Sequence, residues 1–429
     1  MVSAIETFRP HPEQGRLFRS PARFSVTAAG RRSGKTAIHK RKMFQRMLTF
    51  SEPQGRFFFA APTNDQARKL YWEDLKRAFP AEFLLGKPRE TEMSVHLCND
   101  VVARVVGMDR PQRIEGDHID GIVLDEYADM HPHVWSSHVR PGLSSPGRAP
   151  GFAWFLGVPD IRGPHFRDLF RSAQNPDITD WDAFHWVSAD VLDPEEIAAA
   201  RRDLDEQSFA QEYEASFIVA TGRAYYAYDP TIHTAEPLEY NPDEELYLCF
   251  DFNVEPGVCA IVQDWSGFTD VIGEVWIPRS SNTPMVCHKI LEDWGTHRGP
   301  VTLDGDATGA ARKTSATRGS DWDLILDELR PTFGARLRKR VPKANPAERV
   351  RVNAVNTRLM SADGDVRMRI DPAKAPHIAQ DFDEVCVVEG SAGEIDKKSA
   401  PHLTHMSDAV GYHVVRKHPI RKHKLVVSR

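Results

Sequence analysis

A short glycine-rich turn is the first place in this chain where residue types and spacing predict chemistry. Residues 30–36 read GRRSGKT, after an apolar run at 23–30 and before a segment with helical periodicity. Small residues let backbone N–H groups turn inward toward phosphate oxygens, and the N-terminus of the following helix adds partial positive charge. The context therefore predicts a phosphate-binding loop for a nucleotide. The residues expected at the phosphates are Gly30, Ser33, Gly34, Lys35 and Thr36.

Individual side chains of this loop have separate predicted roles. Lys35 is expected to contact the β- and γ-phosphates of ATP, and the Thr36 hydroxyl is expected to ligate Mg²⁺. Arg31 and Arg32 are unusual in such a loop, and either could neutralise charge that develops on the γ-phosphate, as an arginine finger does. The alternative is that they face solvent or bulk phosphate. Because Ala29 stands where the usual spacing has glycine, the prediction depends on the flanking strand and helix as well as on the motif.

An apolar strand that ends in two acids supplies the second half of the predicted nucleotide site. Ile122, Val123 and Leu124 precede Asp125 and Glu126. Because ligands of open α/β sheets bind at the carboxyl edge of the strands, both acids are expected near the loop. Asp125 would hold Mg²⁺, usually through water, and Glu126 would polarise the attacking water. A solvated strand end is the alternative for this pattern when it stands alone.

Aspartates near the ends of two later strands and at the start of a late helix predict a second site. Asp251 ends one apolar run, and Asp304 and Asp306 end another. Asp408 lies at the start of the helical segment 405–415, in its first turn. Mg²⁺ and Mn²⁺ prefer such hard oxygen ligands, and two ions about 3.5–4 Å apart stabilise the attacking and leaving oxygens of phosphodiester cleavage. Since Asp304 and Asp306 share one strand face, their spacing leaves open which one is the ligand.

The elements that must position these residues follow from the apolar pattern. Short apolar runs at 23–30, 56–63, 118–126 and 152–159 alternate with helical segments, which predicts a mostly parallel sheet with helices on both faces. From residue 245 three β-rich segments precede a helix, another strand and a late acidic helix. That order fits an RNase H-like nuclease. The predicted fold class is therefore α/β, with a P-loop NTPase domain and an RNase H-like domain.

Changes in pattern divide the chain into four predicted parts. The stretch that begins at Pro194 is mainly helical and connects the two β-rich regions. The predicted parts are an N-terminal P-loop ATPase domain at 1–174, a lid or linker region at 175–241, an RNase H-like nuclease domain at 242–415 and a basic C-terminal tail at 416–429.

Composition restricts the class of protein. The chain has 429 residues, of which 41% are hydrophobic and 27% charged, as is usual for a globular protein. It has no apolar run of roughly 18 residues and no apolar segment at its start, so neither a membrane-spanning helix nor a signal peptide is expected. Five scattered cysteines without a CxxC pair favour reduced thiols over a disulfide framework or a zinc site.

The charge of the chain is unevenly distributed. Its formal net charge is −6, yet basic residues gather at 307–320, 330–358 and 416–429. A solvated surface is the ordinary explanation of one basic run, whereas three of them on an acidic chain indicate contact with nucleic acid. The residues expected nearest the predicted nuclease are Arg336, Arg338, Lys339, Arg340 and Lys343.

Taken with these motifs, the chain resembles the large terminase subunit of tailed bacteriophages over nearly its whole length. GRRSGKT is similar to that family's phosphate loop, HPEQ places Gln14 at its adenine-contacting glutamine, and IVLDE is similar to its Asp–Glu strand. FLGVPDIRG resembles its coupling segment, with Val158 where the family usually has threonine. DFNVEPG, GDATGAARKTSAT and EIDKKSAPHLTHMSDAVGY resemble its nuclease segments. The resemblance implies the metal ligands Asp251, Asp306 and Asp408, with Asp304 in reserve and His405 as a neighbour of the metals or a surface histidine.

The resemblance implies a motor that hydrolyses ATP to move double-stranded DNA into a procapsid and cuts concatemeric DNA by two-metal phosphodiester hydrolysis. The implied cofactors are ATP and Mg²⁺, and Mn²⁺ would also serve the nuclease site. The implied partners are double-stranded DNA, the portal protein of the procapsid, the small terminase subunit and further copies of the chain in a ring on the portal, in the host cytoplasm and away from membranes. The alternatives are a helicase–nuclease of DNA repair or restriction, and a non-enzymatic assembly scaffold with a degenerate nucleotide fold.

Overall fold

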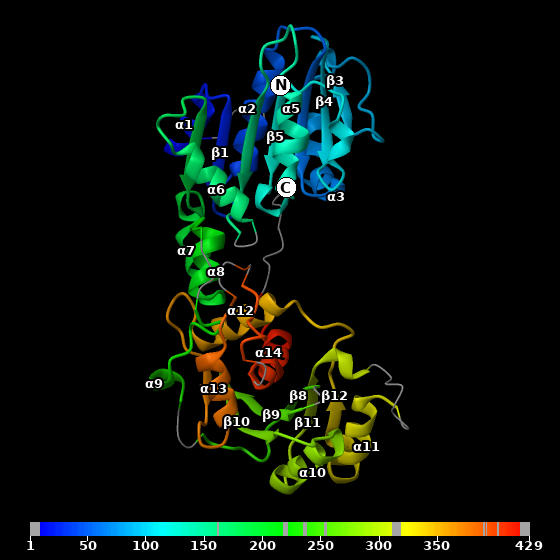
Figure 1. Ribbon diagram of the computed structural model, residues 1–429, viewed down its shortest axis with the longest axis vertical. Helices are drawn as coiled ribbons and strands as arrows, with labels where there is room; N and C mark the ends of the chain where they lie inside the picture. Colours follow the sequence, from blue (N-terminus) through cyan, green and yellow to red (C-terminus); the bar gives the residue numbers. More distant parts are fainter. Residues whose placement is uncertain are drawn as a thin grey trace. The chain divides into compact units, whose positions relative to one another are not determined.

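Two compact units make up the chain in the computed structural model (Figure 1). The first unit comprises Met1–Ile197 and Ala210–Ile218, and the second comprises Ala198–Phe209 and Val219–Arg429. Each unit is built around a sheet of its own. The structure describes residues 9–160, 163–217, 222–234, 238–252, 255–310, 319–388, 391, 393–400 and 403–420.

The sheet of the first unit has seven strands and is mostly parallel. In chain order the strands are β1 (Phe24–Ala29), β2 (Gly55–Ala61), β3 (Ser94–His96), β4 (Val101–Gly107), β5 (Gly121–Asp125), β6 (Phe152–Gly157) and β7 (Trp181–Trp186). Their spatial order is β3-β4-β2-β5-β6-β1-β7, and only the β3–β4 pair is antiparallel. β1 and β5 are buried at every residue, as parallel strands covered on both faces are.

Helices cover both faces of this sheet. On one face Phe57 of β2 packs in a cluster with Met43, and on the other face Phe58 packs in a cluster with Phe166. The helices of this unit are α1 (Pro12–Arg19), α2 (Lys35–Leu48), α3 (Asn64–Ala67), α4 (Glu73–Arg77), α5 (Arg140–Gly142) and α6 (Pro164–Ala173). Two further helices, α7 (Pro194–Asp203) and α8 (Glu206–Tyr213), each contribute residues to both units.

The four apolar runs predicted as strands are β1, β2, β5 and β6, whereas β3, β4 and β7 were not predicted. β7 pairs in parallel with β1, so the first sheet extends past the predicted boundary at residue 174. Only two of the six residues of β7 are buried, and its sequence WDAFHW has no continuous apolar run. An edge strand of this kind lacks the signal that reveals a central one.

The sheet of the second unit is mixed. Its strands are β8 (Leu246–Asp251), β9 (Gly257–Trp265), β10 (Phe268–Ile277), β11 (Val301–Gly305), β12 (Leu337–Lys339) and β13 (Met368–Ile370). The spatial order is β12-β11-β8-β9-β10-β13. β8, β9 and β10 form an antiparallel meander, and β11 and β12 add in parallel beside β8. This is the predicted RNase H-like arrangement, and β13 extends its far edge in parallel with β10.

Two layers of helices enclose the second sheet. The helices are α9 (Pro230–His233), α10 (Thr283–Trp294), α11 (Asp321–Phe333), α12 (Glu348–Leu359), α13 (Pro376–Glu384) and α14 (His405–Lys417). Figure 1 shows α10 and α11 grouped apart from α12, α13 and α14. Consistently, Leu248 of β8 packs in a cluster with Ile290 of α10, whereas the next residue, Cys249, packs in a cluster with Val410 of α14.

Some predicted features lie outside the described residues. These are residues 253–254 of DFNVEPG, 311–318 of GDATGAARKTSAT, 161–162 of the coupling segment, 401–402 before the last helix and 421–429 of the basic tail. Among the described residues, no helix is both long enough and apolar enough to cross a membrane.

Candidate functional site

The predicted phosphate loop connects β1 to α2 in the first unit. Lys35 is the first residue of α2, and Gly34 before it has a φ of 78°. A side chain would be strained in that left-handed conformation, and its β-carbon would lie 2.8 Å from Gln14 Nε2. At Gly30 a β-carbon would lie 2.4 Å from the carbonyl oxygen of Tyr213. The shape of the loop therefore requires glycine at both positions.

Asp125, at the end of β5, is the centre of a buried hydrogen-bond cluster beside the loop. Its Oδ2 accepts hydrogen bonds from Thr36 Oγ1 and from the Tyr71 hydroxyl, each at 2.8 Å. Its Oδ1 accepts a hydrogen bond from the backbone N–H of Glu126 at 2.9 Å. Burial, together with the charge of Glu126, raises the pKa of Asp125 to about 6. The structure thus brings together Thr36 and Asp125, the two residues predicted to hold Mg²⁺.

Glu126 lies between the loop lysine and the end of β6. Lys35 Nζ is 3.6 Å from Glu126 Oε1. Glu126 has a φ of 53°, an uncommon backbone conformation that costs energy and clusters at functional sites. A β-carbon at Gly157, the last residue of β6, would lie 3.6 Å from Glu126 Cα. β6 therefore brings the start of FLGVPDIRG, the segment that resembles the family's coupling segment, to a position beside Glu126.

Gln14 and Trp186 meet at one carbonyl oxygen of the loop. Gln14 Nε2 donates a hydrogen bond to the Ser33 carbonyl oxygen at 2.9 Å, and Trp186 Nε1 donates to the same atom at 3.0 Å. The buried Lys42 ammonium holds the end of α1, which carries Gln14, by donating to two carbonyl oxygens at 2.7 and 3.0 Å. Burial lowers the pKa of Lys42 to about 8. Gln14 is thus held against the phosphate loop, and its contact with adenine stays a prediction.

The two loop arginines have different surroundings. Arg31 forms an ion pair with Glu212 of α8, and its backbone N–H donates to the Glu212 carbonyl oxygen at 2.7 Å. The side-chain hydrogen bond to Glu212 raises the pKa of Arg31. Arg32 has a φ of 56°. Burial raises the pKa of the nearby Tyr213 phenol, and the charge of Arg32 opposes that rise. Both predicted arginines therefore lie at the loop, with Arg31 linked to α8.

Tyr412 of α14 marks the region of the second unit where three predicted carboxylates gather. Burial is the main cause that raises the pKa of its phenol, and the charges of Asp251, Asp306 and Asp408 all add to that rise. The backbone N–H of Asp306 donates to the carbonyl oxygen of Phe250, the residue before Asp251, at 3.0 Å. His405, one turn before Asp408 in α14, lies 3.3 Å from Asp251 Oδ2. The structure thus brings the predicted metal ligands to the region where β8 and β11 end and α14 begins.

Two of these carboxylates are held by neutral partners and a histidine. Asp306 Oδ1 accepts hydrogen bonds from the Thr308 backbone N–H at 2.7 Å and from Asn345 Nδ2 at 2.6 Å. Asp251 Oδ2 lies 3.3 Å from His405 Nδ1. His405 is therefore a direct neighbour of the predicted site, one turn of α14 before Asp408.

Asp408 is held by two cations. Arg351 Nη2 donates to its Oδ1 at 2.5 Å, and Lys397 Nζ donates to its Oδ2 at 3.1 Å. Burial raises the pKa of Asp408, and the charges of Arg351 and Lys397 oppose that rise. The third predicted ligand is thus neutralised by the protein itself.

The donor chemistry of this region fits a divalent cation. Asp251, Asp306 and Asp408 offer hard carboxylate oxygens, which Mg²⁺ and Mn²⁺ prefer. The charge of Asp251 also raises the pKa of Asp408, and a bound cation would relieve this repulsion. Among the described residues, however, no three His, Cys, Asp or Glu side chains are close enough to hold an ion in their present positions.

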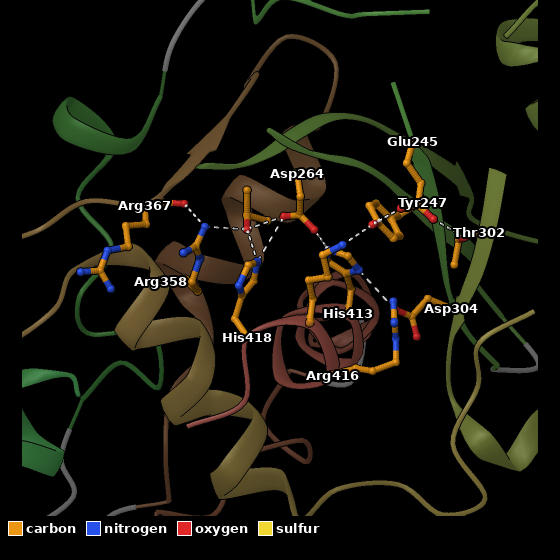
Figure 2. Close-up of polar contacts among 12 residues, drawn as sticks. Glu245, Tyr247, Asp264, Thr302, Asp304, Arg358, Arg367, His413, Arg416 and His418 are labelled. Atoms are coloured by element: carbon orange, nitrogen blue, oxygen red, sulfur yellow. Dashed lines mark hydrogen bonds and ion pairs between the residues drawn. The ribbon is translucent and has the colours of Figure 1, made fainter. Parts of the chain in front are cut away.

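Asp304, the reserve ligand, belongs to a separate buried cluster (Figure 2). His413 lies between two carboxylates, with Nδ1 3.2 Å from Asp304 Oδ2 and Nε2 2.8 Å from Asp264 Oδ2. Arg416 Nε donates to Asp304 Oδ2 at 2.6 Å. Burial raises the pKa of Asp304, but the hydrogen bonds from His413 and Arg416 outweigh it and hold that pKa below its ordinary value.

β11 ends between Asp304 and Asp306, so the structure distinguishes two aspartates that the sequence spacing could not. β11 ends at Gly305, whose φ of 138° lets the chain turn before Asp306. The expected shared face of Asp304 and Asp306 therefore does not persist. Asp304 pairs with α14, and Asp306 is the better candidate for a metal ligand.

The basic residues around β12 divide into two groups. Arg338, Lys339, Arg340 and Lys343 have exposed side chains. Arg336 is used within the fold, because it donates to the carbonyl oxygens of His297 and Gly299. The exposed group offers a positive surface suited to a phosphate backbone.

Several residues at these sites were not predicted. Tyr71 reaches Asp125 from a π-helical turn at Arg68–Trp72, a feature that is frequent at functional sites but leaves no mark in helical periodicity. Glu212 and Trp186 reach the loop from elements far along the chain, and Lys397 reaches Asp408 from a loop. Their contacts depend on tertiary structure, which spacing does not encode.

Relatives in sequence cover about half of the chain. No protein-family model matches it. The large terminase subunit of Thermus virus P23-45 is 28% identical over 256 residues, which cover 52% of this chain and 52% of that protein. The large terminase subunit of Escherichia phage T5 is 25% identical over 220 residues, covering 50% of this chain and 48% of that protein. The chain thus spans about half the length of the curated relatives it matches.

The fold comparison extends to both units. The solved large terminase of the thermophilic bacteriophage D6E aligns with a TM-score of 0.59 at 15% identity, over 95% of this chain and 99% of that chain. The chain is similar to phage large terminases in sequence and in fold. Because nearly the whole chain is matched, the large terminase fold accounts for both sheets, the P-loop unit and the RNase H-like unit that follows it.

Proposed function

We propose that the chain is a subunit of a phage DNA-packaging motor, which hydrolyses ATP to translocate double-stranded DNA into a procapsid and also cuts concatemeric DNA. One observation carries this proposal. A phosphate loop with Lys35, Asp125 and Glu126 assembled beside it occurs in the same chain as three carboxylates at the neighbouring ends of β8 and β11 and the start of α14. The similarity to phage large terminases supports it.

ATP turnover is assigned to the first unit. The loop N–H groups and Lys35 would bind the phosphates, Gln14 would contact the adenine, and Thr36 and Asp125 would hold Mg²⁺, which when bound neutralises phosphate charge. Glu126 orients the attacking water and accepts its proton. A D6E large terminase structure with a TM-score of 0.56 and 16% identity was solved with ATP-γ-S, which supports ATP as the nucleotide. Arg31 or Arg32 supplies further positive charge at the γ-phosphate.

DNA cleavage is assigned to the second unit. Asp251, Asp306 and Asp408 would hold two Mg²⁺ or Mn²⁺ ions, which when bound stabilise the attacking and leaving oxygens of the phosphodiester. Asn345 and Thr308 keep Asp306 oriented, and His405 remains near Asp251. The exposed basic residues around β12 would grip the DNA backbone without reading its sequence.

Assembly with other components completes the proposed activity. The proposed partners are double-stranded DNA, the portal protein of the procapsid, the small terminase subunit and further copies of this chain in a ring on the portal. The proposed setting is the host cytoplasm. Contacts with the DNA would be mainly to phosphates, so binding is expected to depend strongly on salt and weakly on sequence.

Two single substitutions separate the proposed activities. Lys35→Ala removes the phosphate-binding ammonium, so ATP turnover should fall by at least about 100-fold while Mn²⁺-dependent plasmid digestion persists. Asp251→Asn removes a metal-binding charge, so digestion should be lost while ATP turnover persists. Exposed Lys69→Ala and Asp293→Asn are the matched controls and should leave both activities intact.

The same assays contain the outcomes that reject the proposal. Wild-type ATPase activity in Lys35→Ala would remove the nucleotide assignment, and normal plasmid digestion by Asp251→Asn would remove the nuclease assignment. A strand-displacement assay addresses the alternative function. ATP-dependent separation of DNA strands would identify a helicase–nuclease, because a packaging motor moves duplex DNA without separating its strands.

A further inference from the structure

Asp408 has a positively charged partner on each of its carboxylate oxygens. Arg351 Nη2 is 2.5 Å from Oδ1, and Lys397 Nζ is 3.1 Å from Oδ2. Asp408 is 4% exposed, and a buried carboxylate without a counter-ion would be strongly destabilising. The two cations therefore supply the positive charge that a metal ion would otherwise supply at this residue.

The two cations differ in how firmly they are held. The Arg351 side chain is 4% exposed, and its guanidinium lies 4.5 Å from the centroid of the Tyr412 ring. It packs so closely on α14 that a β-carbon at Gly411 would lie 2.6 Å from Arg351 Cγ. Arg351 is thus fixed in place by its surroundings.

Lys397, in contrast, has a second acceptor within reach. Its side chain is 47% exposed, and Nζ lies 3.2 Å from Glu348 Oε2 as well as 3.1 Å from Asp408 Oδ2. Glu348 is at the start of α12 and its side chain is 33% exposed. A small rotation of the long Lys397 side chain can therefore move its ammonium away from Asp408 while the ion pair with Glu348 is kept.

We propose that Lys397 is a displaceable counter-ion of the nuclease site. In the metal-free protein it neutralises Asp408 Oδ2, and a divalent cation that binds Asp408 displaces it toward Glu348. This inference rests on the proposed nuclease function. Because the ion pair with Asp408 must break before the metal binds, Lys397 weakens metal affinity and stabilises the metal-free protein.

The test measures Mn²⁺ binding to the full chain in the absence of DNA. The electron paramagnetic resonance signal of free Mn²⁺ monitors the binding. Lys397→Met should bind Mn²⁺ about two- to fivefold more tightly than wild type, the range expected for loss of a partly exposed ion pair. Its Tm without metal should be lower, and the rise in Tm on adding Mn²⁺ should be larger. Lys397→Arg retains the charge and should bind Mn²⁺ less tightly than Lys397→Met.

A control separates local displacement from general charge. Lys398→Met removes the same charge from the next residue, which is exposed, and should leave Mn²⁺ affinity unchanged. Wild-type or weaker affinity in Lys397→Met, or equal tightening in Lys398→Met, would overturn the counter-ion role. Even if the counter-ion role of Lys397 is overturned, the proposed nuclease site is retained when wild type binds Mn²⁺ and Asp408→Asn does not. If neither wild type nor Lys397→Met binds Mn²⁺, both the inference and the proposed nuclease site are rejected.

Discussion

At the scale of single residues, Tyr71 shows how a side chain outside any motif can set the geometry of the proposed nucleotide site. Its hydroxyl donates to Asp125 Oδ2, the oxygen that also accepts from Thr36. Burial and the charge of Asp125 raise the pKa of Tyr71 well above its ordinary value, so the hydroxyl keeps its proton and remains a donor. Tyr71 therefore acts as a positioning residue for Asp125.

Replacement of Tyr71 by Phe should lower the kcat/KM of ATP hydrolysis by about 10- to 100-fold. The substitution removes one hydrogen bond to a charged acceptor, an interaction worth about 1.5–3 kcal/mol, and leaves the ring packed in the core. Steady-state phosphate release measures the effect, and circular dichroism verifies the fold. Tyr240→Phe is the control, because it removes a hydroxyl bonded to His297 in the other unit. An unchanged kcat/KM in Tyr71→Phe would show that Thr36 and the Glu126 N–H suffice to orient Asp125.

At the scale of elements, His413 joins α14 to the sheet of the second unit. It contacts Asp264 at the end of β9 and Asp304 in β11, as Figure 2 shows. His418 and Arg416 are the other titratable side chains on these two carboxylates. Although burial lowers it, the pKa of His413 is raised overall by its hydrogen bonds to the two carboxylates. The position of α14, and with it of Asp408, depends on this charged cluster.

His413→Gln should destabilise the second unit by about 3 kcal/mol at pH 6, because it leaves two buried carboxylates short of a counter-charge. The folded state raises the pKa of His413 above its unfolded value of about 6.5, so this stabilisation is full below that pH and is lost as pH rises through the folded pKa. The difference in Tm between wild type and His413→Gln should therefore shrink as the pH is raised above about 6.5. The exposed His288→Gln is the control. A difference that stays constant with pH would mean that His413 contributes by packing alone.

The same scale shows what the sequence could predict and why the rest escaped it. β1, β5 and β8 are buried at every residue, and their sequences are mainly apolar. The sequence therefore predicted these strands and the residues that lie at their ends. β7 is a half-buried edge strand, and the predicted shared face of Asp304 and Asp306 ends at the turn through Gly305. Contacts such as Tyr71 with Asp125 join distant segments, and no local spacing reports them.

At the scale of the whole molecule, the distribution of charge decides where an acidic chain could hold the proposed DNA. The formal net charge is −6, so nonspecific attraction of a polyanion by the chain as a whole is not expected. Local positive surface must therefore provide the grip. Arg338, Lys339, Arg340 and Lys343 have exposed side chains on and after β12, which pairs with the strand that leads to Asp306. These residues would place phosphate contacts on the strand next to a proposed metal ligand.

Replacing those four residues by Gln should flatten the salt dependence of DNA binding as well as weaken it. Each lost phosphate contact makes the negative slope of log K against log salt concentration less steep by about 0.9. Replacing all four residues should therefore reduce its magnitude by roughly 2–4. Fluorescence anisotropy of a labelled duplex at several salt concentrations measures the slope. The matched control replaces four exposed basic residues elsewhere, Lys69, Arg77, Lys289 and Arg298, and removes the same charge. If both variants shift the slope equally, DNA responds to total charge and the surface around β12 has no special role. A change confined to the β12 variant would assign the phosphate contacts to this surface, because both proteins carry the same net charge.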